Sequence, residues 1–183
     1  MSRISLTRKA LPFAVALLCG LGVSAPVSAR SWKQSPQAAA LEYSQIVDNR
    51  DKDLHFVWWL SSPSFPDAPG VGPMLDKYFI LAVAHGKMDA TLDVTFVPVE
   101  APVVKDAGGK TLRLLKDDEL APGATALLSG LKSLLPRMIG PMGKGMEMFV
   151  YEPGGVEACK AGKVSVVMPQ ETYTFDTPLP GCP

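Results

Sequence analysis

Apolar residues dominate both faces of the segment 54–60. Leu54, Phe56, Trp58 and Leu60 share one face, and His55, Val57 and Trp59 share the other. A strand with one solvated face would alternate apolar and polar residues, whereas this one has only His55 as a polar position. The pattern therefore predicts a central strand that is covered on both sides.

Six further segments have the pattern of short strands. The apolar run 78–84 also fits the middle of a buried helix, but its length and its bulky start favour a strand. Segment 91–99 alternates and is expected to end near Pro98, at an edge or a bulge. The others are 111–115, 146–151, 163–168 and 171–175, with a tight connection at 169–170 joining the last two.

Two segments have helical spacing instead. Ser35 and Pro36 are typical of a helix start, and the apolar positions that follow predict a helix ending near Asn49. Pro122 opens a clearer helix, which Pro136 should end. Its single apolar stripe consists of Leu127, Leu128, Leu131, Leu134 and Leu135. The stretch 136–145 is expected to be flexible.

The order of these elements indicates the fold class. Strands follow one another in groups and do not alternate with helices, which argues against a parallel sheet with crossover helices. We expect a mainly β fold: an antiparallel β-sandwich or sheet of about seven short strands, with an N-terminal helix and one inserted amphipathic helix. An α+β arrangement is the alternative.

The first 29 residues have the three-part layout of a secretory signal peptide. Arg3, Arg8 and Lys9 precede an apolar run over 11–23, and small residues occupy positions 27 and 29. The run is shorter than the roughly 20 residues that span a bilayer. We therefore expect cleavage after Ala29, periplasmic or secreted localisation, and one globular domain over 30–183.

Composition agrees with one folded domain. The 183-residue chain is 47% apolar and 20% charged, with 18 basic and 18 acidic residues. Loss of the three leader cations leaves 15 basic and 18 acidic residues, a net charge of −3. This balance gives no reason to expect a nucleic-acid partner.

Cysteine usage fits an oxidising compartment. Cys19 would leave with the leader, so Cys159 and Cys182 remain. We expect them to form a disulfide that fastens the proline-rich C-terminus, since two distant cysteines without a nearby histidine make a poor metal site.

Catalytic motifs are largely missing. His55 and His85 lie in apolar segments, where a histidine is usually structural, and no metal-protease spacing is present. No cofactor fingerprint is found, so no cofactor is expected. A small hydrolase with an unorthodox site near Asp117, Asp118 and Glu119 is one alternative, although those acids are more typical of a solvated turn.

Methionine provides a second alternative. Met138, Met142, Met146 and Met148 fall within eleven residues of a glycine-rich stretch. Thioether sulfur is a soft ligand that suits Cu(I), so the alternative function is a periplasmic Cu(I)-handling protein. The competing interpretation is that these side chains fill gaps in the core.

The loop 61–73 is the remaining candidate. It contains four prolines and two glycines, so no regular element is expected there, and it presents Phe65 near Trp58 and Trp59. An aromatic side chain on a stiff frame loses little entropy on docking, which suits a protein or glycan partner. The leading hypothesis is therefore an exported, non-catalytic binding or structural domain of the cell envelope.

Overall fold

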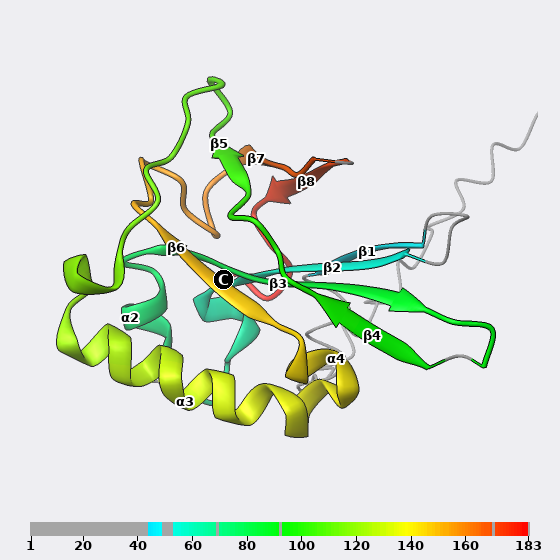
Figure 1. The fold of residues 1–183 in the computed structure, drawn as a ribbon. Coiled ribbons are helices and arrows are strands. Elements are labelled where there is room, and N and C mark those ends of the chain that lie inside the picture. The colour runs from blue at the N-terminus through cyan, green and yellow to red at the C-terminus, as the bar shows by residue number, and fades with distance from the viewer. Residues whose placement is uncertain (1–43, 49–52, 69, 92, 170, 183) are drawn as a thin grey trace, which may run out of the picture. The chain divides into compact units, whose positions relative to one another are not determined.

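The computed structural model describes residues 44–48, 53–68, 70–91, 93–169 and 171–182, which belong to a unit spanning Lys33–Pro183 (Figure 1). The expected leader lies outside the described residues and stays a prediction.

Five antiparallel strands form the first sheet. Strand β2 (Asp53–Leu60) lies between β1 (Ser44–Asp48) and the long β3 (Phe79–Met88). The far edge of β3 is shared by two strands: β6 (Glu147–Tyr151) pairs with its first half and β4 (Val94–Val97) with its second half. Strands β2 and β3 are therefore the centre of the sheet.

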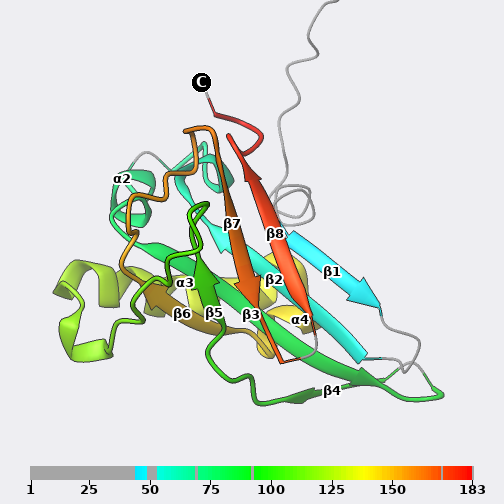
Figure 2. The same cartoon turned by 90° about the horizontal axis from the view of Figure 1, so that it is seen from above.

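A second, three-stranded antiparallel sheet covers one face of the first. It consists of β5 (Val103–Lys105), β7 (Gly162–Val167) and β8 (Thr172–Thr177), in the order β5-β7-β8. Helix α3 (Pro122–Ile139) lies on the other face of the first sheet, as Figures 1 and 2 show from two directions. The first sheet is thus the middle of three layers.

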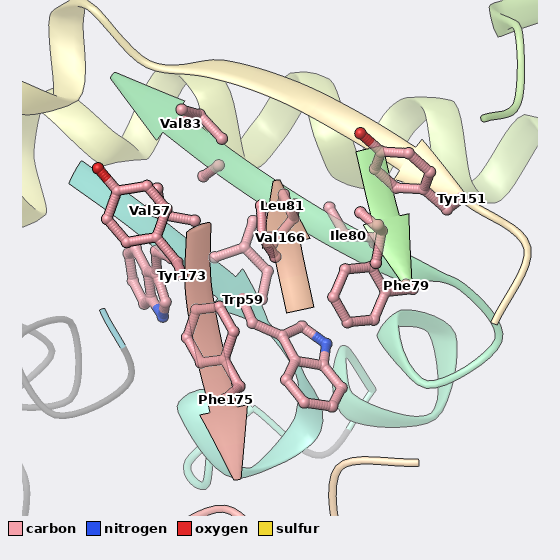
Figure 3. Packing of buried hydrophobic residues seen from close by; sticks show 14 of the residues in the cluster. Val57, Trp59, Phe79, Ile80, Leu81, Val83, Tyr151, Val166, Tyr173 and Phe175 are labelled. Carbon is pink, nitrogen blue, oxygen red and sulfur yellow. The ribbon is translucent and has the colours of Figure 1, made fainter. Parts of the chain in front are cut away.

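Aromatic rings fill the space between the two sheets (Figure 3). Trp59 packs against Phe79 at a ring-centroid distance of 4.7 Å and meets the edge of Phe175 at 6.0 Å. Such large side chains contribute most of the buried apolar area of a core. On the helix side of the sheet, Leu131 and Leu135 of α3 join the same buried cluster.

The expected mainly β fold of two antiparallel layers is confirmed. Strand β2 is central and buried on both faces from His55 onward, as the sequence predicts. The run 78–84 forms a strand from Phe79, and this strand continues to Met88. The last three predicted strands correspond to β6, β7 and β8.

The predicted N-terminal helix is wrong over Ser44–Asp48, which form β1; its earlier part lies outside the described residues. The backbone of β1 pairs with β2 from Ser44↔Trp58 to Asp48↔Leu54. Without this partner, the buried strand β2 would leave one edge of hydrogen-bonding groups unpaired. Pairing with the following strand overrides the helical spacing of the segment.

Pro136 does not end α3, and the stretch 136–145 is not irregular. The helix continues to Ile139, and α4 (Pro141–Lys144) follows. A proline removes one helical hydrogen bond, here to the carbonyl of the exposed Lys132, which water can satisfy. The actual stop is Gly140, whose φ of 66° favours glycine.

Three smaller expectations also need correction. The loop 61–73 contains the 3-10 helix η1 (Ser62–Ser64) and the start of α2 (Gly72–Leu75). Each of these helices has a proline at its start, where the missing backbone N–H would have no partner within the helix in any case. Segment 111–115 forms isolated bridges, since Thr111 pairs with the end of β5 and Leu114 with β6. Strand β5 was not predicted.

Candidate functional site

An apolar groove runs between the η1–α2 segment and helix α3. We call it the α3 groove; its volume is about 490 Å³, within the range of roughly 300–1,000 Å³ that ligand pockets occupy. Asp67 is the charged residue among those that line it. The lining residues are Ser64, Phe65, Pro66, Asp67, Ala68, Val71, Ala126, Leu127, Gly130, Leu131, Leu134 and Met138.

One wall of the α3 groove is part of the leucine stripe predicted from the sequence. Leu131 and Leu135 are buried against the sheet, whereas Leu127 is half-buried and Leu134 is 46% exposed. The apolar stripe is therefore wider than the surface that the sheet covers. Its uncovered margin faces the groove.

Phe65 forms part of the opposite wall. Its ring stacks on Trp58, with centroids 6.0 Å apart and planes inclined by 18°, and Trp58 is fully buried. Two backbone hydrogen bonds of 3.0 Å, from Ser64 N to Ser61 O and from Phe65 N to Ser62 O, fix the turn that carries the ring. Phe65 therefore caps the core on one side and lines the α3 groove on the other.

The structure does not bring all three predicted partner-binding aromatics together. Trp59 points to the opposite face of β2, where it packs between the two sheets. Phe65 is half-buried, whereas Trp58 is fully buried and stacks against the Phe65 ring. Partner binding by these residues stays a prediction.

A second cluster lies at the other end of β2. His55 and His85 are directly opposite each other in the β2–β3 register, and their ring centroids are 4.2 Å apart. Asp53, two residues before His55 on the same face, places its Oδ1 3.5 Å from His85 Nε2. One donor atom from each of the three residues can be chosen so that all lie within 4.8 Å of one another.

His55 is a buried polar residue without hydrogen bonds to its ring. The residue is 3% exposed, and neither ring nitrogen has a hydrogen-bond partner among the described residues. Burial lowers the pKa of His55, and His85 lowers it further, while the carboxylates of Asp53 and Glu171 act in the opposite direction. The neutral imidazole, which carries a free lone pair, is therefore favoured.

The four methionines are distributed over three elements. Met138 lies in α3 and Met142 in α4, while Met146 precedes β6 and Met148 lies within it. Met146 is buried, and the other three are partly buried against the core. Each therefore has a packing role, and copper binding by the group stays a prediction.

The predicted disulfide between Cys159 and Cys182 is present. It joins the β6–β7 connection to the C-terminal tail, where Leu179 N also donates to Ala158 O at 2.8 Å. The tail is thus fixed next to the second sheet by a covalent bond and by main-chain contacts.

The acidic group 117–119 forms an exposed 3-10 turn, η2. Glu119 accepts hydrogen bonds from Lys116 N at 2.8 Å and from the Arg113 guanidinium. Since its carboxylate is used to hold the turn, it has a structural role. A hydrolase site there stays a prediction.

Comparison of the chain with protein-family models, with curated proteins and with solved structures finds no match.

Sequence reasoning missed the grouping of Asp53, His55 and His85. Strand alternation places His55 on the Trp59 face, so part of the signal was present. The register that brings His85 opposite His55 depends on a connection of 18 residues, 61–78, and such a connection does not fix pairing in the way a tight hairpin does.

Proposed function

We propose that the chain is an exported, non-catalytic binding protein of the cell envelope whose α3 groove binds the apolar face of an amphipathic helix of another protein. The observation that carries this proposal is the 46% exposed Leu134 within an apolar groove. An exposed apolar surface of this kind is typical of an interaction site.

Two features support export. The leader pattern of residues 1–29 is that of a cleaved signal peptide. The disulfide between Cys159 and Cys182 is compatible with an oxidising compartment, where such bonds persist. Within the described residues, no helix combines the length and the apolar character that a bilayer-crossing segment requires.

The length of the groove favours an elongated occupant. The lining residues of α3 extend from Ala126 to Met138, and twelve helical steps cover about 18 Å. A helix of similar length can place apolar side chains along such a groove at three- and four-residue spacing.

Charge favours a peptide over a fatty acid. Asp67 is the charged residue in the lining, and it would repel the carboxylate of a fatty acid. A segment with apolar residues and a lysine or arginine near one end would instead place opposite charges together. We therefore take an amphipathic, basic helix as the occupant.

The opposite wall is organised before binding. Phe65 is followed by Pro66 and is stacked on the buried Trp58, so its ring loses little conformational freedom when a partner contacts it. A preorganised aromatic anchor of this kind lowers the entropic cost of association.

A synthetic peptide tests the proposal. The probe is a fluorescent helix-forming peptide with leucine and lysine at helical spacing, titrated into the purified mature protein and followed by anisotropy. Leu134→Asp should weaken binding by about thirtyfold, because it replaces an apolar contact of the groove with a carboxylate that would have to lose its hydration. Lys132→Gln, on the polar side of the same helix, is the matched control and should bind as wild type does.

Two results would oppose this function. If palmitate binds in the α3 groove with Leu134→Asp abolishing it, while the peptide does not bind, the occupant is a lipid and the proposal is wrong. Equal peptide affinity of wild type and Leu134→Asp would show that the groove is not the site. Export has a separate test: the mass of the protein recovered from the envelope should correspond to residues 30–183.

A further inference from the structure

The rings of His55 and His85 contain buried nitrogen atoms without hydrogen-bond partners among the described residues. His55 is 3% exposed, yet both of its ring nitrogens lack a hydrogen-bond partner within the described residues. His85 Nε2 is buried and also has no hydrogen bond there, although Asp53 lies beside it. Buried polar groups without partners are costly, so such a pair indicates a missing ligand.

The surrounding donors have the composition of a transition-metal site. Two imidazoles and one carboxylate face one another on β2 and β3. Imidazole nitrogen is a preferred ligand of Zn²⁺ and its first-row neighbours, whereas Ca²⁺ and Mg²⁺ prefer oxygen donors. This set of donors therefore favours Zn²⁺ or another first-row transition metal over Ca²⁺ and Mg²⁺.

The spacing of the donors is close to what such an ion needs. Atoms bound to a tetrahedral ion at about 2.0–2.1 Å lie roughly 3.4 Å apart. His85 Nε2 and Asp53 Oδ1 are already 3.5 Å apart. The full set of donor atoms lies within 4.8 Å, so ligation requires the most distant pair to approach to about 3.4 Å.

We propose that Asp53, His55 and His85 form a binding site for a single divalent transition-metal ion. We take Zn²⁺ as the ion that this site binds. The three residues supply three ligands, and the fourth position is open to water or to another group. This site lies on the face of β2 opposite Trp58 and does not depend on the function proposed for the α3 groove.

Nearby charges support a cation at this position. Glu171, which immediately precedes β8, interacts electrostatically with His55, and its carboxylate adds negative charge to the site. Lys87 pairs with Asp53 in the strand register and brings a positive charge nearby, but it is exposed to solvent. Solvent screens an exposed charge more than a buried one.

The test uses untagged, metal-free mature protein and zinc chloride alone. Isothermal titration calorimetry should give one Zn²⁺ ion per chain, and the melting temperature should rise with zinc concentration. Co²⁺ serves as a spectroscopic substitute, because its visible absorption reports tetrahedral nitrogen and oxygen ligation.

Two conservative variants remove one ligand each. His85→Gln and Asp53→Asn should each weaken zinc binding by more than about tenfold, the loss that even outer-shell partners cause. Lys87→Gln is the matched control: it changes a charge on the same face without removing a ligand, so zinc should bind at least as tightly as in wild type. Circular dichroism establishes that each variant is folded.

A measurement on the wild type avoids any folding defect of the variants. The chain has two histidines, so its imidazole nitrogen resonances in NMR belong to His55 and His85. Zinc should shift the resonances of both rings together. Three results would overturn the proposal: absence of zinc binding, binding that leaves these resonances unmoved, or variants His85→Gln and Asp53→Asn that bind zinc as tightly as wild type does.

Discussion

Breaking the disulfide between Cys159 and Cys182 should lower the free energy of unfolding by about 3 kcal/mol. The cysteines are 23 residues apart, and constraining a loop of that size in the unfolded chain has about this value in the chain-entropy model. Packing and main-chain hydrogen bonds also hold the tail. Leu179 is buried and Leu179 N donates to Ala158 O, while Cys182 N donates to Leu179 O at 3.3 Å.

The assay compares wild type with the double variant Cys159→Ser, Cys182→Ser, which leaves no free thiol to cross-link. For a mature chain of the expected length, 1 kcal/mol corresponds to roughly 2–4 °C, so the melting temperature should fall by roughly 6–12 °C. Urea unfolding should give the same free-energy difference at an altered midpoint.

Reductant provides the control. It should shift the melting temperature of wild type toward that of the double variant and leave the double variant unchanged. If wild type melts at the same temperature with and without reductant, the stabilising role of the bond is refuted. If the protein from the cell envelope carries two free thiols, the disulfide and the export argument that uses it both fail.

Three other perturbations test the packing and the surface. Leu135→Ala should cost about 2–5 kcal/mol in chemical denaturation because Leu135 is fully buried, whereas Leu134→Ala should change stability far less. Gly143→Ala should cost about 1–3 kcal/mol, since an added methyl group would overlap the backbone of Leu135. Arg113, which donates to Glu152 at 2.7 Å, lowers the pKa of that carboxyl. The stabilisation is therefore present above the usual carboxyl pKa and is lost as pH falls, so melting curves of Arg113→Ala and wild type should differ at neutral pH and converge in acid.

The central strands were predictable because their signal is local. Apart from His55, each face of 54–60 is apolar, and the run 78–84 has a bulky, β-favouring start. Burial on both faces follows directly from that composition. The same holds for the start of α3, since Pro122 and the leucine stripe lie within one continuous segment.

Features that depend on pairing or packing with another segment were not predictable. The β1 segment has helical spacing, yet pairing with β2 determines its conformation. Pro136 is tolerated because the residues after it, Met138 and Ile139, pack against the core and favour continuation of the helix. The α3 groove likewise required the η1–α2 segment to be placed beside α3, which no periodicity encodes.

The two proposed sites should function independently, since they use opposite faces of β2. Trp58 supports Phe65 on the helix side, while His55 faces the second sheet. Strand β2 is paired on both edges, and this pairing fixes its register. Binding on one face therefore cannot shift the strand relative to its neighbours. We expect Leu134→Asp to leave zinc affinity unchanged and His85→Gln to leave peptide affinity unchanged. A change of more than about threefold in either cross-measurement would mean that β2 transmits binding energy between its faces, and the sites would then form one coupled system.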